Sequence, residues 1–355
     1  MQKKQLLFSA MILAGMMSFP AFGQTNVHVL DVGQGLSVLI ESDGHYMLYD
    51  GGDSNKSSYV VSYLQNEQVS SLDYVVASHY DSDHLNGVVG ALNAFPVKQV
   101  WGPSYETDTK VYQSFCSAAE EKGLSVVQPS VGSKYSLGDA VIQVLAPSGD
   151  NYTDVNNYSI AIRVEDGDTS FLITGDAEAD SEAEMIASGL ELDSDVYVMG
   201  HHGSGTSTSW DLLQAAVPEY AVLSCGTGNS YGHPHIESME KLQAMDIPLF
   251  RTDKQGTIVA STDGSSITWN VEPCNDYSPG DPNDVPAQPQ SSNQPSGNTS
   301  ASETLSVVYW TPGGKSYHSR RSCSTLSRSK TVISGSLNDA LNAGKSDPCN
   351  VCIKQ

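Results

Sequence analysis

The segment 78–84 constrains this chain more than any other, because it places two imidazoles and two carboxylates within six residues. The candidate ligands are His79, Asp81, Asp83 and His84, and an apolar run at 72–77 precedes them. Such a run predicts a buried strand, so the polar side chains fan out from the turn at its end. We expect this turn to hold two divalent cations. The alternative is a solvated polar turn, which the apolar flanks on both sides disfavour.

The hydrophobic pattern of the rest of the first 270 residues predicts a layered α/β fold. Helical periodicity is expected at 57–65, 85–95, 111–122, 179–187 and 236–244. Strand-like runs are expected at 26–31, 36–40, 46–50, 97–101, 140–145, 159–164, 170–174, 195–199, 220–224, 257–260 and 266–269. Because strands outnumber helices and both halves have a similar order, we expect two sheets packed face to face with helices outside.

The first 23 residues are typical of a secretory signal peptide. Lys3 and Lys4 precede an apolar stretch at 6–17, and small residues end the segment at Gly23. The apolar stretch is shorter than the ~20 residues that span a bilayer. We therefore predict cleavage after Gly23, a secreted or periplasmic mature protein, and no transmembrane segment after cleavage. A retained N-terminal anchor is the alternative.

Composition divides the mature chain into three parts. We expect one large folded domain at 24–274, a flexible linker at 275–305 rich in Pro, Ser, Asn and Gly, and a small module at 306–355. The chain carries a net charge of −23, but the small module holds seven basic residues against two acidic ones. An acidic main domain repels polyanions at long range, which counts against avid, non-specific nucleic-acid binding.

Several ordered motifs of the first domain resemble the metallo-β-lactamase fold. They are Leu-Asp-Val-Gly-Gln-Gly at 30–35, Tyr-Asp-Gly-Gly at 49–52, the segment 78–87, Thr-Gly-Asp at 174–176, His-His-Gly-Ser at 201–204 and Tyr-Gly-His-Pro-His at 231–235. More narrowly, the set is similar to the extracytoplasmic hydrolase domain of the ComEC-type competence proteins. The resemblance covers about 26–270 and implies an αββα sandwich with a metal site at one edge, between the sheets.

The resemblance also implies a ligand set for two metals. It assigns metal binding to His79, Asp81, Asp83, His84, Asp176 and His233. Asp176 would bridge the pair, and His235 is a weaker alternative to His233. Asp83, His201 and His202 are the candidate catalytic residues, with one of the two adjacent histidines acting as ligand or proton donor. Asp31 and Asp50 are expected to orient ligands or to stabilise turns.

The nature of these side chains leaves the metal open between zinc and manganese. Imidazole favours Zn²⁺, whereas carboxylates favour harder ions, and the family's usual second histidine is replaced here by Asp81. A pair of such ions lowers the pKa of a bound water and stabilises charge on a phosphoryl or acyl oxygen.

The C-terminal module has the residues for a second, structural metal site. His318, Cys323, Cys349 and Cys352 supply one imidazole and three thiols, which suits a closed tetrahedral zinc site. A core of about 50 residues normally needs such a staple. A disulfide in an oxidising exterior is the alternative. The basic charge of the module makes it a candidate contact to a cell surface or to nucleic acid.

Taken together, the sequence predicts a secreted hydrolase with two divalent metal ions. We expect phosphodiester hydrolysis of extracellular nucleic acid or of a nucleotide-like substrate. Two alternatives stay open: a lactone or β-lactam hydrolase with the same metal centre, and a non-catalytic binding protein that the metals stabilise.

Overall fold

The structure is a computed structural model. It describes residues 23–284 and, in the C-terminal module, residues 308–318, 325–326, 332–335, 340, 343, 345 and 347–349. The expected signal peptide, most of the expected linker, and Cys323 and Cys352 lie outside the described residues.

Two sheets form the centre of the main domain. The first has the strand order β15 (Ile267–Trp269), β14 (Ile258–Thr262), β1 (Thr25–Val29), β2 (Val38–Ser42), β3 (His45–Tyr49), β4 (Leu72–Val76), β5 (Val97–Trp101) and β6 (Val126–Val127). The second has the order β13 (Leu249–Arg251), β12 (Tyr220–Leu223), β11 (Val196–Val198), β10 (Thr169–Ile173), β9 (Ile162–Asp166), β8 (Ala140–Val144) and β7 (Lys134–Leu137).

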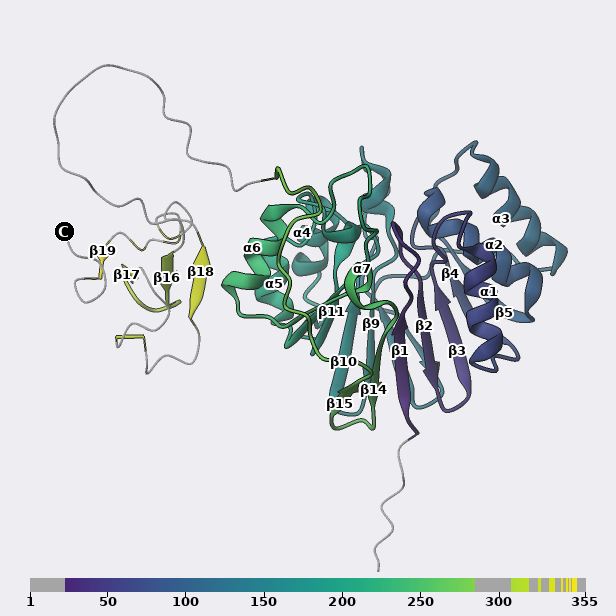
Figure 1. The fold of residues 1–355 in the computed structure, drawn as a ribbon, viewed down its shortest axis with the longest axis horizontal. Helices are drawn as coiled ribbons and strands as arrows, with labels where there is room; N and C mark the ends of the chain where they lie inside the picture. Colours follow the sequence, from purple (N-terminus) through teal and green to yellow (C-terminus); the bar gives the residue numbers. More distant parts are fainter. Residues whose placement is uncertain are drawn as a thin grey trace, which may run out of the picture.

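Helices cover the outer face of each sheet, which gives four layers (Figure 1). The first sheet is covered by α1 (Ser57–Asn66), α2 (Ser82–Ala94) and α3 (Lys110–Glu121). The second is covered by α4 (Ala179–Ala187), α5 (Trp210–Ala216) and α6 (Ile236–Ala244). Three short helices complete the domain: η1 (Val155–Tyr158), η2 (Gly200–Gly203) and α7 (Thr252–Gln255).

The main core lies between the two sheets, and it explains why the strands read as continuous apolar runs. In β2, Val38 and Ile40 face the other sheet, while Leu39 packs under the helices. Phe171 and Leu172 of β10 divide in the same way. A strand buried on both faces needs apolar residues at every position rather than at alternate ones. The predicted two-sheet α/β fold is confirmed.

The boundaries of the elements differ from the sequence expectations at a few places. Helix α2 begins at Ser82 rather than at residue 85, so Asp83 and His84 belong to its first turn instead of to a loop. The sequence did not predict α5, α7, β6, β7 or β13. No helix among those the structure describes combines the length and apolar character needed to cross a membrane.

The described parts of the C-terminal module form two small sheets. Strand β16 (Val308–Trp310) pairs antiparallel with β18 (Ile333–Gly335), and β17 (Ser316–Tyr317) pairs parallel with β19 (Asp347–Pro348). Val308, Trp310 and Ala340 are buried together.

Candidate metal centre

The candidate ligands meet at one edge of the sandwich, beyond the ends of four strands. Asp50 follows β3 and His79 follows β4, while Asp176 follows β10 and His202 follows β11. Strands β3 and β4 are parallel neighbours, as are β10 and β11, so each pair ends at the same edge of its sheet. A backbone hydrogen bond of 2.9 Å from Ile160 N to Ser78 O joins the two sheets beside the ligands.

The start of α2 is held against neighbouring loops by close backbone contacts. Gly51 N donates to His84 O at 2.6 Å, and Leu36 N donates to Asp83 O at 3.3 Å. A Cβ atom on Gly87 would lie 2.0 Å from the carbonyl oxygen of Gly51. This distance is too short for any side chain. The glycine pair therefore lets the helix approach closely enough for His84 to reach the strand ends.

Asp50 orients both histidines of the motif. This carboxylate is fully buried, and it accepts hydrogen bonds from Ser78 Oγ at 2.7 Å and from His84 Nδ1 at 2.8 Å. Because the Ser78 hydroxyl donates to Asp50, it accepts from His79 Nδ1, 3.0 Å away. Both imidazoles thus carry a proton on Nδ1 and direct Nε2 toward the centre. The expected orienting role of Asp50 fits this geometry.

His202 presents its Nε2 atom from the other sheet. Its Nδ1 atom donates to Ser224 O at 3.1 Å. Its Nε2 atom lies 3.2 Å from His84 Nε2, 3.3 Å from Asp176 Oδ2 and 3.5 Å from Asp83 Oδ2. His201 and His202 both have a left-handed backbone, with φ of 48° and 54°. This conformation turns the His202 ring back toward the strand ends.

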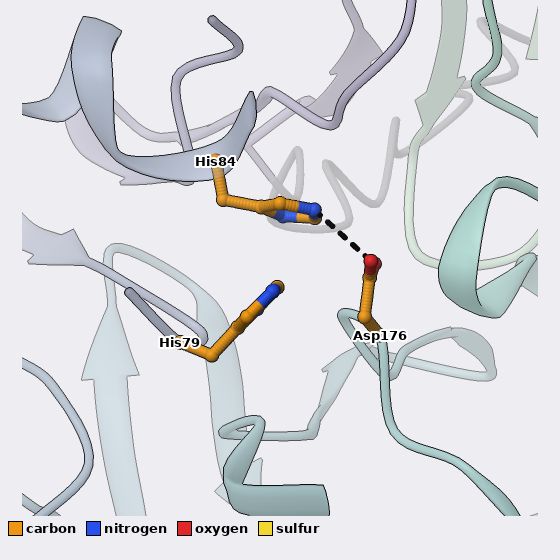
Figure 2. Close-up of side chains that lie close together, drawn as sticks. All are labelled: His79, His84 and Asp176. Atoms are coloured by element: carbon orange, nitrogen blue, oxygen red, sulfur yellow. Dashed lines mark ion pairs between the residues drawn. The ribbon is translucent and has the colours of Figure 1, made fainter. Parts of the chain in front are cut away.

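Two groups of ligand atoms are close enough to hold metal ions. The first is His79, His84 and Asp176, and the second is Asp83, His84 and His202, with the atoms of each group within 4.8 Å of one another. Figure 2 shows the rings of His79 and His84 pointing toward Asp176, whose Oδ2 atom lies 3.2 Å from His84 Nε2. Two buried atoms, His79 Nε2 and Asp176 Oδ1, have no hydrogen-bond partner. Buried ligand atoms without hydrogen-bond partners, on residues of one group, fit a cation.

The electrostatics of the centre also favour a positive charge among its carboxylates. Burial would raise the pKa of Asp176, but His202 and His84 hold it well below 3.8. Burial would lower the pKa of His84, but Asp176 and Asp50 raise it well above 6.5. His79 behaves differently, because burial and the nearby His84 lower its pKa to about 4. A neutral His79 keeps the lone pair that a metal ligand needs.

Asp81 stands at the rim of the centre. It is the residue before α2, where an aspartate usually caps the helix, yet its side chain makes no capping hydrogen bond. Its Oδ2 atom lies 3.9 Å from His79 Nε2, and 53% of the side chain is exposed. The carboxylate therefore remains available to a ligand on the open side.

His201 lies next to the centre with a carboxylate behind it. Its Nε2 atom is 3.7 Å from Asp176 Oδ2, and its Nδ1 atom is 3.1 Å from Glu178 Oε1. Thr206 Oγ1 donates to the same Glu178 oxygen at 2.7 Å. Glu178 was not predicted from the sequence as a site residue, although it lies only two residues after Asp176.

His233 lies outside both groups. Its ring centroid is 5.3 Å from that of His201 and 6.2 Å from that of His202. Gly226 N donates to Gln34 Oε1, so the Gln34 amide nitrogen donates to His233 Nδ1, 3.2 Å away. This contact leaves the proton of a neutral His233 on Nε2, the tautomer opposite to that of His79, His84 and His202. His235 lies further out, where its Nδ1 atom accepts from Gly205 N.

Two of the four candidate ligands of the C-terminal module are described, and they lie near each other. Thr325 Oγ1 is 3.3 Å from His318 Nδ1 and 3.5 Å from Cys349 Sγ. Both His318 and Cys349 are buried. The placement of these two residues is compatible with one shared site.

Comparisons with known proteins agree with this architecture. The metallo-beta-lactamase superfamily matches residues 30–227. The chain is 30% identical over 274 residues to ComE operon protein 3 of Bacillus subtilis, covering 71% of this chain and 35% of that protein. It is 34% identical over 258 residues to Recombination protein 2 of Haemophilus influenzae, covering 71% and 30%. The chain thus spans about a third of the length of these curated relatives.

Among solved structures, the metallo-beta-lactamase fold protein YhfI from Bacillus subtilis is similar, with a TM-score of 0.47 and 14% identity. That match covers 67% of this chain and 100% of YhfI.

Proposed function

Because this chain belongs to the metallo-β-lactamase superfamily and is a metal-dependent hydrolase, we propose that it cleaves phosphodiesters with two bound metal ions. The substrate that we propose is extracellular nucleic acid or a nucleotide-like ester. One observation carries the proposal: ligand atoms from both sheets converge on the buried, unpartnered atoms His79 Nε2 and Asp176 Oδ1.

We assign one metal to His79, Asp81 and Asp176, and the other to Asp83, His84 and His202. Asp176 has two oxygens and lies between the two groups, which suits a bridging ligand. Three imidazoles and three carboxylates suit both Zn²⁺ and Mn²⁺. When bound, two divalent ions provide a nucleophilic water at neutral pH and stabilise charge on the ester oxygens.

His201 is the residue to which we assign proton transfer to the leaving group. It is partly exposed, with 20% of its side chain accessible, and its Nε2 atom faces the centre beside Asp176. Glu178 Oε1 accepts from Nδ1 and so holds the ring with Nε2 toward the centre. Protonating an alkoxide lowers the barrier for a poor leaving group such as a sugar hydroxyl. Glu178 acts through His201 as a positioning residue.

The relatives make nucleic acid the first substrate class to test. The name of one of them, Recombination protein 2, refers to recombination. The chain spans only a third of their length, so their substrates are a proposal for this chain. Secretion after cleavage at Gly23 would give the enzyme access to extracellular nucleic acid, and it too is a proposal.

A substrate panel tests the reaction. The mature chain, residues 24–355, is loaded with Zn²⁺ or Mn²⁺ and offered single-stranded DNA, bis(p-nitrophenyl) phosphate, nitrocefin and a lactone. We expect turnover of the first two substrates only. Asp83→Asn should abolish it, whereas Asp180→Asn, an exposed carboxylate in the first turn of α4, should leave it unchanged. Hydrolysis of the lactone or of nitrocefin alone, or no turnover with either metal, would refute the proposal.

We also propose that the C-terminal module binds a structural Zn²⁺ through His318, Cys323, Cys349 and Cys352. The approach of His318 and Cys349 to Thr325 supports this assignment. Elemental analysis of the full chain tests it together with the main centre: three metals per chain support both sites, and two metals with a disulfide detected by mass spectrometry would contradict zinc in the module.

A further inference from the structure

We propose that tyrosine rings at the two ends of the metal centre are stacking platforms for the bases on either side of the scissile phosphodiester. The preferred substrate would then be a strand with unpaired bases. This inference rests on the proposed phosphodiesterase function and specifies how that site selects its substrate.

The first platform, Tyr105 and Tyr158, lies at the end of the centre marked by His79 and Asp81. Tyr80 N, between these two ligands in sequence, donates to Tyr105 Oη at 2.8 Å. The ring centroids of Tyr105 and Tyr158 are 4.8 Å apart. Tyr158 directly precedes Ser159, whose hydroxyl accepts from Asp176 N at 3.1 Å and lies 3.5 Å from His79 Nδ1.

The rings of this platform are held in place through their hydroxyl groups. Tyr158 Oη donates to Asp150 O at 2.9 Å, and Tyr105 Oη is engaged by the Tyr80 backbone. Tyr152, whose ring packs edge-on against Tyr158 at 4.9 Å, donates its hydroxyl to Glu184. Both platform rings are partly exposed. Tyr105 packs against both Tyr80 and Tyr158, with centroid distances of 4.8 Å to each, so Tyr158 is the ring of this platform that a base would contact. Because its hydroxyl is occupied, the Tyr158 ring is already ordered, which lowers the entropic cost of binding.

The second platform is Tyr231, which lies beside His233, on the side of the centre away from His79 and Asp81. This side chain is 63% exposed, although it is a large aromatic residue. Its ring stacks on His233 with a centroid distance of 5.6 Å and an interplanar angle of 25°. His233 in turn packs against His201 at 5.3 Å. The exposed Tyr231 ring, stacked on His233, thus extends the histidine cluster with an aromatic surface that a base could contact.

The charge around the centre explains why stacking would matter here. No Lys or Arg appears among the described residues that contact the ligand atoms by hydrogen bond, ion pair or ring packing. These described contacts thus include none of the basic side chains that usually neutralise phosphates and give nucleic-acid affinity. Base–aromatic stacking does not need positive charge and accepts any base, but the base must be unpaired and accessible.

The test compares a fluorescein-labelled deoxythymidine decamer with an abasic decamer of the same length and charge. For the full metal-loaded chain we expect kcat/KM to be about 100-fold higher on the base-bearing decamer, because each of the two stacked bases contributes about 10-fold. A duplex of the same length should be cleaved more slowly than the single strand.

Four variants assign this preference to the rings. Tyr231→Ala and Tyr158→Leu should each lower the ratio of the two rates by about 10-fold without changing the rate on the abasic decamer. Tyr231→Trp and Tyr158→Phe should keep the ratio. Tyr231 is exposed, so its replacement does not disturb the fold. The matched control is Tyr59→Ala, an exposed tyrosine on α1.

Two results would contradict the stacking proposal. One is a ratio of the two rates near one in the wild type, and the other is an equal loss of kcat/KM on both decamers in the tyrosine variants. Fluorescence anisotropy in EDTA separates the platform from the reaction. If neither decamer is cleaved but base-dependent binding is lost in Tyr231→Ala, the stacking proposal stands and the phosphodiesterase proposal fails.

Discussion

The two sheets contribute to the candidate metal centre by different physical means. The first sheet supplies His79, Asp81, Asp83 and His84 from one strand end and one helical turn, and hydrogen bonds to Asp50 orient the rings. The second supplies Asp176 and His202 from the ends of two strands, and a left-handed backbone places the His202 ring.

This difference shows what fixes the ligand positions in each half. A side-chain network such as the one around Asp50 keeps the motif half in order whether or not a metal is present. Left-handed backbone costs a non-glycine residue roughly 1–2 kcal/mol, so His201 and His202 depend on the surrounding fold to hold them. We therefore expect the second half to rely more on the cation that both halves share.

Replacing the shared ligand should have the largest effect. Asp176→Asn keeps the size of the side chain but removes the charge that lies near His84, His202 and His201. We expect phosphodiesterase activity to fall by about 10³-fold or more and the main centre to lose at least one metal ion. Elemental analysis and steady-state kinetics measure both. Full metal content with full activity would show that Asp176 does not link the halves, and Asp180→Asn is the control.

Two histidines of the second half, His202 and His233, should differ in their effect on metal affinity. His202→Gln removes a convergent Nε2 atom, whereas His233→Gln removes a ring whose Nδ1 atom accepts from Gln34. We expect metal affinity to fall by more than about 100-fold in the first variant and by less than about 10-fold in the second. Competition with a chromophoric chelator measures both affinities. The reverse order would restore His233 as the ligand.

The orienting carboxylate of the first half should have an intermediate effect. Asp50→Asn keeps the shape but places an amide where Ser78 N, Ser78 Oγ and His84 Nδ1 all donate. Loss of such an outer partner lowers metal affinity by about 10-fold to 100-fold. Asp43→Asn, in an exposed turn that also has positive φ, is the matched control. An unchanged affinity would mean that His79 and His84 do not need Asp50 to orient them.

The smallest effect concerns the stability of the sheet that carries the first half. Burial lowers the pKa of His28 in β1 to about 4. The unfolded chain binds this proton near pH 6.5, so its contribution to stability is present above pH 6.5 and is lost as the pH falls toward 4. The loss is at most about 3 kcal/mol.

Urea unfolding of the metal-free protein at pH 7.5 and pH 4.5 measures this loss. The unfolding free energy of His28→Gln should change less between the two pH values than that of the wild type. His45→Gln, at an exposed histidine, should behave like the wild type. If the two variants respond alike, acid sensitivity of the first sheet arises elsewhere.

The sequence constrains the first half of the candidate centre more tightly than the second, for a physical reason. His79 to His84 lie within one turn, so their order in the chain already determines that their side chains gather. The choice between His202 and His233 depends on backbone φ values and on an amide from Gln34, 199 residues away from His233. Neither the φ values nor the contact with Gln34 can be predicted from the residues next to His202 and His233 in the sequence. In the same way, the seven-residue helix α5 is too short to show a clear period, although Ser209 caps it.

The contact between Gly51 and Gly87 separates what can vary in this protein from what cannot. A candidate ligand such as Asp81 lies at the rim, so another ligand residue can replace it. Such a replacement would change which metal ion the centre prefers. The spacing between helix and strand end has no such freedom, because even one added methyl group at either glycine would collide with main-chain atoms. Divergent descendants of this chain should therefore change their metal and their chemistry long before they change these two positions.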